Sequence, residues 1–443
     1  MINNFKIINS NRVITFFLII LFLISLNYYL LFIIASLFFI SFIIYFDLLK
    51  NLTKLNLNLF KLFPLLFYAQ KLISIFINQN KSIFWDMQLF IFELNCQFDW
   101  SLHYTYKFSN EIIECTSLGF GPFPKYIYGP FSKLFLVLLD PWSTSLIIFS
   151  VLFIIFIYLI LSKVSHDQLF IYLLITFPPF LFLFETLNHD LIFLYSFLLL
   201  IRNNKILNNN LYLFLLTILT LFKIYTIAIL FGELIYRFFN NQRFSKILIV
   251  SLFNVVILFW YYTSLNLEVP NPISKVLTFG LLHDLRLIKS ININSYFLFI
   301  ILLFTGIILL ISKRKNVYRL LFKSKIETWN KNILYLIVLF LFLGLFINSY
   351  SNYGYKFSLN ILIVLVITRY LTKNALILLV FVFSMIPIQY FVGSTLENNF
   401  FELVIFFLNK VAYYGYLFFI LTLAIYVIEN KNLITKDISD PAS

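Results

Sequence analysis

Scarce acidic side chains are the first candidates for chemistry in this chain. Asp86 stands in Trp85–Asp86–Met87, immediately after an apolar run, and Asp99 stands between Phe98 and Trp100. A carboxylate at the edge of a membrane, partly removed from water, can take a proton from a hydroxyl group that attacks a substrate. An ordinary solvated acid beside interfacial tryptophans would have the same neighbours. We therefore treat Asp86 as the first candidate for a general base and Asp99 as the second.

A second polar group interrupts the apolar sequence at Asn188–His189–Asp190. Ionisable groups at membrane depth are costly, so they tend to be functional or paired with one another. These residues are candidates for substrate binding, and a plain polar turn between two spans is the other interpretation.

Three isolated cations could hold a phosphate group. Lys223 lies alone within a long apolar stretch, Arg286 follows a His-Asp pair, and Lys356 ends a tyrosine-rich segment. Each could form a charge-assisted hydrogen bond with a phosphate oxygen. For Lys223, which we expect to face the outer headgroup layer, the other interpretation is a lysine that snorkels to the membrane surface.

Tyrosines near two predicted outer loops are candidates for sugar binding. Tyr128 precedes Gly129–Pro130, and Tyr353 and Tyr355 lie in a segment rich in tyrosines and amides. Such residues can stack on sugars and donate hydrogen bonds to them. They are equally typical of the aromatic belt at a membrane interface, and Gly-Pro is a common structural turn.

Cys96 and Cys115 are the two cysteines of the chain. Both fall in one long segment, and a disulfide between them is plausible if that segment faces an oxidising compartment. Two unpaired thiols remain the alternative. Two cysteines alone do not make a zinc site, which normally has four ligands, and the sequence predicts no metal site.

The amino-acid composition indicates the class of protein that must position these candidate site residues. The chain has 443 residues, 61% of them hydrophobic and 12% charged. Soluble domains are usually nearer half apolar and a quarter charged, so soluble enzymes and disordered proteins are excluded. The net charge of +14 is spread between apolar runs, which is typical of topology determinants and not of a nucleic-acid surface.

The apolar runs predict an all-α, polytopic membrane protein with about 12–14 transmembrane helices. Most Lys and Arg fall in alternate loops, including the basic loop 313–331. We expect the chain to lie in the inner membrane of the cell, and the positive-inside rule then places both termini in the cytoplasm. This orientation requires that residues 210–236 divide into two short segments, 210–222 and 224–236, at Lys223.

The longest interruption, residues 79–142, follows the third predicted span. It contains aromatics and a Gly/Pro cluster, so we expect an ordered loop on the non-cytoplasmic face. Within it, residues 93–97 and 109–114 are predicted to form short interfacial helices. The whole chain, residues 1–443, is predicted to form a single transmembrane domain.

Together these features resemble the GT-C superfamily of integral membrane glycosyltransferases, and most closely glycosyltransferase family 87. The resemblance covers roughly residues 80–360 and rests on Asp86, Tyr128–Pro130, 188–190 and 221–225. It implies an inverting transfer of a hexose or pentose from a polyprenyl-phosphate donor to a lipid or glycan acceptor on the non-cytoplasmic face. It also implies that Asp86 is the general base and that Lys223, Arg286 or Lys356 holds the departing phosphate.

Other functions remain open. No Walker A, GxGxxG, HExxH or CxxC motif is present, so the sequence predicts no cofactor. The partners that we expect are the lipid-linked donor, the acceptor and membrane lipids, with no nucleic acid. A polysaccharide polymerase or O-antigen-ligase type of enzyme shares this architecture, although its large loop usually comes late in the chain. A transporter or flippase of lipid-linked sugars is the non-enzyme alternative.

Overall fold

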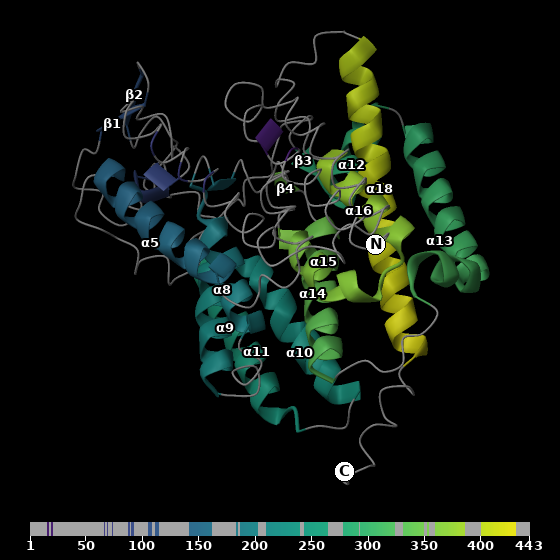
Figure 1. Ribbon diagram of the computed structural model, residues 1–443, viewed down its shortest axis with the longest axis horizontal. Coiled ribbons are helices and arrows are strands. Elements are labelled where there is room, and N and C mark those ends of the chain that lie inside the picture. Colours follow the sequence, from purple (N-terminus) through teal and green to yellow (C-terminus); the bar gives the residue numbers. More distant parts are fainter. Residues whose placement is uncertain are drawn as a thin grey trace, which may run out of the picture. The chain divides into compact units, whose positions relative to one another are not determined.

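Helices dominate the structure, a computed structural model (Figure 1). The residues that it describes are 16, 19, 20, 66, 69, 73, 87, 88, 90–92, 105–108, 111–114, 141–161, 183, 184, 187–202, 210–239, 243–264, 278–291, 293–323, 331–349, 352, 353, 359–385 and 400–430. The helical class predicted from the apolar runs is confirmed for this part of the chain. The chain divides into two compact units. Whether they form one transmembrane domain stays a prediction.

Unit 2 comprises residues 69–164 and 182–271. Its described helices are α5 (Pro141–Leu161), α8 (Asp190–Arg202), α9 (Asn210–Phe222), α10 (Ile227–Phe239) and α11 (Ser245–Ser264). The 3-10 turn η5 (Ile224–Thr226) lies between α9 and α10. Helix α5 packs on α8, and α11 packs on both α9 and α10. Leu258 of α11 contacts Leu221 and Ile227, so it spans the junction of α9 and α10.

An antiparallel pair of strands, β1 (Thr105–Phe108) and β2 (Glu111–Glu114), also belongs to unit 2. The prediction of a helix over 109–114 is therefore wrong for Glu111–Glu114. Phe108 pairs with Glu111 across a two-residue connection, which is the commonest geometry for a hairpin. The adjacent β-branched residues Ile112 and Ile113 favour the extended backbone.

Unit 1 comprises residues 1–68, 165–181 and 272–443. Its described helices are α12 (Leu281–Ile291), α13 (Ile293–Leu321), α14 (Lys331–Ser349), α15 (Ile361–Ile367), α16 (Lys373–Met385) and α18 (Phe400–Glu429). Strands β3 (Thr278–Phe279) and β4 (Asn352–Tyr353) form a short antiparallel pair, and the 3-10 turn η7 (Thr368–Tyr370) precedes α16. Helix α18 packs on α13, α14 and α16.

Helices α13 and α18 lie side by side and run in the same direction (Figure 1). Phe299, near the start of α13, contacts Tyr414 of α18 with ring centroids 5.6 Å apart. Near the other end, Arg314 forms an ion pair of 2.6 Å with Glu429. A Cβ atom on Gly306 would lie 2.8 Å from the tip of the Phe418 ring, so a larger residue there would require this ring to shift.

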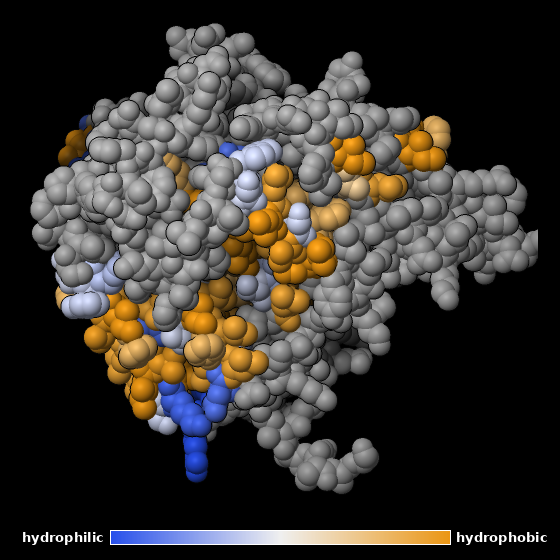
Figure 2. Space-filling view, turned by 90° about the vertical axis from the view of Figure 1, so that its left-hand side faces the viewer, coloured by the Kyte–Doolittle hydropathy of each residue, from blue (hydrophilic) through white to orange (hydrophobic). Residues whose placement is uncertain are grey.

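Two described helices, Ile293–Leu321 and Phe407–Glu429, are long and apolar enough to cross a membrane. Other described helices, among them α9, α11, α14 and α16, are apolar but shorter. Hydrophobic residues also gather on the face of the molecule in view in Figure 2, as large side chains exposed on its helices. These features indicate an association with membranes.

Candidate functional site

A strained turn delivers the polar residues 188–190 to the start of α8. Leu187 has a φ of 50°, a left-handed conformation that a branched side chain rarely adopts, and it is fully buried. The amide of Asn188 donates to the carbonyl of Leu183 at 2.9 Å, which closes the turn. The side-chain oxygen of Asn188 then accepts a hydrogen bond from the Asp190 amide at 3.0 Å. Asn188 thus satisfies one of the backbone donors left unpaired at a helix start.

Lys223 breaks the apolar stretch between α9 and α10, as the sequence predicted. Its backbone is extended, with φ −140° and ψ 126°, and the 3-10 turn η5 follows directly. The hydroxyl of Thr226 donates to the carbonyl of Lys223 at 2.8 Å, so the interruption of the helix is bridged by a side chain.

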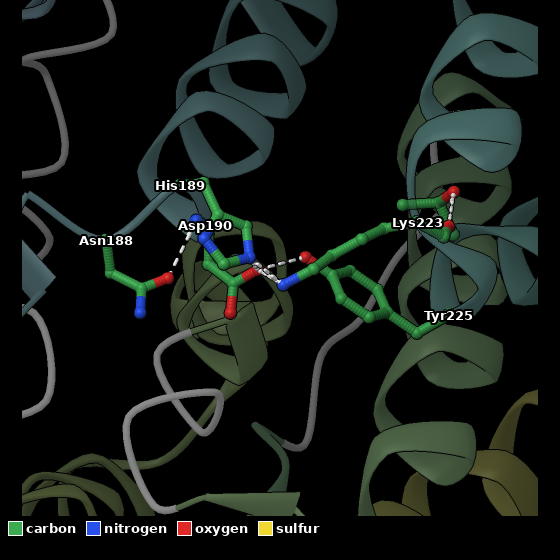
Figure 3. A network of polar contacts seen from close by, with 6 residues as sticks. Asn188, His189, Asp190, Lys223 and Tyr225 are labelled. Carbon is green, nitrogen blue, oxygen red and sulfur yellow. Dashed lines mark hydrogen bonds and ion pairs between the residues drawn. The ribbon is translucent and has the colours of Figure 1, made fainter. Parts of the chain in front are cut away.

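These two features meet in a buried group that we call the first cluster: His189, Asp190, Lys223 and Tyr225 (Figure 3). The Lys223 ammonium donates to Oδ1 of Asp190 at 2.8 Å and also contacts Nε2 of His189. The Tyr225 hydroxyl donates to the same Asp190 oxygen at 2.6 Å. Residues more than thirty positions apart in the sequence therefore share one carboxylate.

The first cluster is sealed from solvent. The side chains of Asp190 and Lys223 are 0% and 4% exposed. A buried ion pair is stable only where its charges are also hydrogen-bonded, and here the histidine and the tyrosine supply those additional bonds. With His189 neutral, the formal charge of the cluster is zero. The expectation that Lys223 faces lipid headgroups is wrong, because its ammonium lies inside the unit and is held by Asp190.

Aromatic residues form the walls of the first cluster. The ring of Phe90 stacks on His189, with centroids 5.0 Å apart, and meets Phe222 edge-on at 6.0 Å. Phe193 of α8 contacts the rings of both Phe222 and Tyr225. Phe90 comes four residues after Asp86 in the sequence. The segment that follows the candidate base thus contributes directly to the wall of the cluster.

Two other predicted site residues are described by the structure, and both belong to unit 1. Arg286 lies exposed on α12 in unit 1. Tyr353 belongs to β4, where its backbone pairs with Thr278. Several predicted residues lie outside the described residues: Asp86, Asp99, Tyr128, Tyr355, Lys356, Cys96 and Cys115.

Tyr225 is a member of the cluster that sequence analysis did not select as a site residue. It lies two residues after Lys223, in the segment 221–225 that carries part of the resemblance, but the chain has 28 tyrosines, so this signal is weak. Among the described residues, no group of three or more His, Cys, Asp or Glu side chains could hold a metal ion.

Comparison with known proteins finds no family model, no curated protein and no solved structure that matches this chain. The function of the protein therefore has to be argued from its own residues.

Proposed function

We propose that the protein is an integral membrane glycosyltransferase that uses a polyprenyl-phosphate-linked sugar. The observation that carries the proposal is the convergence of three sequence features on the first cluster. His189–Asp190 and Lys223 bond to each other, and Phe90, from the segment after Asp86, packs on His189. Buried ionisable groups in an apolar helical protein are usually functional.

The surface of the helices supports a position within the membrane. None of the residues of α13 is buried, and its exposed side chains are large and apolar over most of its length. In unit 2, α11 exposes a similar set: Ile249, Leu252, Phe253, Val256, Phe259 and Trp260. Such a surface would aggregate in water, whereas lipid chains would cover it. We propose that the shorter apolar helices are also spans, which makes the protein polytopic.

Charge at the helix ends supports the proposed orientation. Lys313, Lys315 and Arg319 are exposed at the end of α13, and Arg243 and Lys246 are exposed at the start of α11. Under the positive-inside rule both regions face the cytoplasm. Helices α13 and α18 would then both run from the outer to the inner face, which agrees with their parallel packing.

The proposed reaction needs one base and one fixed cation. The acceptor hydroxyl attacks the anomeric carbon, its proton passes to the Asp86 carboxylate, and the bond from sugar to phosphate breaks. The phosphate departs with both bonding electrons, and a cation held nearby stabilises that developing charge. Inversion follows from a single displacement, and phosphate leaves readily enough that no second carboxylate is required.

In this proposal the first cluster, whose formal charges cancel, supplies one preorganised cationic group, the Lys223 ammonium. Asp190, Tyr225 and His189 hold the Lys223 ammonium in one position, so little reorganisation is needed as the reaction proceeds. The free energy lost in removing the ion pair from water is, in this proposal, what fixes the ammonium in advance of the reaction. Because Lys223 is sealed in this structure, the donor phosphate can reach it only if the Phe90 side of the cluster opens when substrate binds.

Sugar transfer by membranes containing the Asp86→Asn variant tests the proposal. The parent and the variant, expressed to equal levels, are given a panel of radiolabelled polyprenyl-phosphate sugars. We expect the parent to transfer sugar and the variant to lose at least ~100-fold of the rate, as is typical when a general base is removed. Transfer that the variant retains in full would exclude Asp86 as the base. Failure of the parent with every donor would count against the transferase itself.

One observation favours a transporter or flippase as the second candidate. Glu233 of α10 is completely buried and bonds to Arg237, with Nε of Arg237 2.5 Å from a Glu233 oxygen. Charges buried inside helical segments commonly mark ion or substrate pathways in transporters. Uptake of a lipid-linked sugar into proteoliposomes, lost in a Glu233→Gln variant, would favour this function over the transferase.

A further inference from the structure

Unit 1 contains a second group of the same four residue types, which we call the second cluster: His283, Asp284, Lys410 and Tyr414. The Lys410 ammonium donates to Oδ1 of Asp284 at 2.5 Å. The Tyr414 hydroxyl donates to Oδ2 of the same carboxylate at 2.7 Å. As in the first cluster, a histidine directly precedes the aspartate, and one lysine and one tyrosine bond to that aspartate.

Two helices and a glycine turn build the second cluster. Gly280, with a φ of 130° that favours glycine, follows β3 and starts α12, and the Asp284 amide donates to its carbonyl at 3.0 Å. Lys410 and Tyr414 are four residues apart on α18, so they lie on one face of that helix.

The second cluster differs from the first in its access to solvent. The Lys410 side chain is 18% exposed, against 4% for Lys223. Arg286 is exposed on the same helix, three residues after His283, so the two side chains are neighbours along one side of α12. With both histidines neutral, the Asp and Lys charges cancel in each cluster, and Arg286 adds one exposed positive charge beside the second. Of the two clusters as this structure describes them, it is therefore the second that an anion can approach from solvent.

His283 supplies an independent sign of an occupant. Its side chain is more than nine-tenths buried, and its Nε2 atom has no hydrogen-bond partner among the described residues. Burial, and next the charge of Lys410, lower the pKa of His283, which Asp284 opposes and Arg286 assists. An unsatisfied buried nitrogen is costly unless a ligand or water completes its hydrogen bond.

We propose that the second cluster and Arg286 form a binding site for the phosphate of a lipid, distinct from the first cluster. The cations and the Tyr414 and His283 groups would bind the phosphate oxygens. The apolar side chains exposed at the start of α13, among them Ile293, Phe297 and Leu298, would hold the hydrocarbon chain. If the proposed transferase function is correct, this site takes the lipid-linked acceptor while the first cluster serves the donor.

Equilibrium binding of radiolabelled farnesyl phosphate to the full chain, in nanodiscs of phosphatidylcholine, tests the site. Arg286→Gln breaks no hydrogen bond of the described residues, so it should keep the thermal stability and weaken farnesyl phosphate binding at least ~5-fold. Lys410→Gln should weaken farnesyl phosphate binding at least ~10-fold, and Lys410→Arg, which keeps the positive charge, should retain most of the binding. Lys373→Gln, which removes an exposed cation at the start of α16, is the matched control and should change nothing.

The outcomes of this binding experiment distinguish a failure of the proposed lipid-phosphate site from a failure of the proposed transferase activity. Binding that is unaffected by both Arg286→Gln and Lys410→Gln would overturn the site, even if the parent transfers sugar. Binding that depends on both residues would uphold the site even if no sugar transfer is found, and it would then be the transferase proposal that fails. Competition by inorganic phosphate at the same concentration as farnesyl phosphate would overturn the assignment to a lipid.

Discussion

The two clusters use the same side chains in different surroundings. In the first cluster the lysine and the aspartate are sealed behind the rings of Phe90, Phe193 and Phe222, and the formal charges cancel. In the second cluster the lysine reaches solvent and Arg286 adds a positive charge. The comparison shows that residue types alone do not determine the role of such a group. Burial makes the first cluster a fixed internal charge distribution, and partial exposure makes the second a place where an anion can bind.

The largest expected effect is on the stability of the sealed cluster. Asp190→Asn leaves the Lys223 ammonium buried without its counter-charge, and breaking a buried pair in this way costs about 3–5 kcal/mol. Unfolding of the purified chain by a graded denaturing detergent would measure the loss. A loss below about 1 kcal/mol would mean that water reaches Lys223, and the contrast between the two clusters would then disappear.

Asp284→Asn should destabilise the chain less, by about 1–2 kcal/mol. The Lys410 side chain is 18% exposed, so its ammonium can turn toward water once the carboxylate charge is removed. The same unfolding measurement applies. The comparison between the clusters would be reversed if Asp284→Asn proved more damaging than Asp190→Asn.

The tyrosine hydroxyls should contribute about 1 kcal/mol each to stability. Tyr225→Phe and Tyr414→Phe each remove one hydrogen bond to an aspartate and keep the ring that packs on neighbouring aromatics. We expect Tyr225→Phe to be the more damaging, because the Asp190 oxygen that loses this bond is sealed from water. Equal losses, measured by the same unfolding method, would show that solvent access makes no difference at these oxygens.

The smallest expected effect is a pH dependence that comes from His283. Burial and the Lys410 charge lower the pKa of this histidine, so the folded chain binds its proton less tightly than the unfolded chain. Its contribution to stability is therefore constant above the ordinary histidine pKa of about 6.5 and is lost as the pH falls below that value. His283→Gln should flatten the stability profile between pH 7 and pH 5. A profile that is the same in the parent and the variant would contradict the lowered pKa of His283 and, first of all, its burial.

The sequence predicted the positions of helices better than their partners. The distribution of Lys and Arg among the loops was enough to predict the break between α9 and α10, because one continuous span there would place the later basic loops on the opposite side of the membrane. Helix α12 was not predicted, since its eleven residues are amphipathic and do not form an apolar run. Helix α13 continues to Leu321, well beyond its apolar part, because Lys and Arg are good helix formers.

The pairing of residues within each cluster could not be predicted from the sequence. Asn188–Asp190 and Lys223 were each selected for their cost at membrane depth, but nothing in their spacing indicates that they meet. Lys410 and Tyr414 were not selected, because nothing in the sequence around them distinguishes this lysine and this tyrosine from the others of the chain. Only tertiary packing places α18 beside α12 and so brings them to Asp284.

A role of the first cluster in catalysis, beyond its role in folding, can be tested by removing both of its charges at once. The double variant Asp190→Leu, Lys223→Met leaves no unpaired buried charge, and such apolar replacements of a buried pair are often neutral or stabilising. We predict that this variant unfolds within about 1 kcal/mol of the parent and yet loses at least ~100-fold in sugar transfer from polyprenyl-phosphate donors. A double variant that is stable and transfers sugar at the parent's rate would contradict a catalytic role and would leave the cluster a structural role alone.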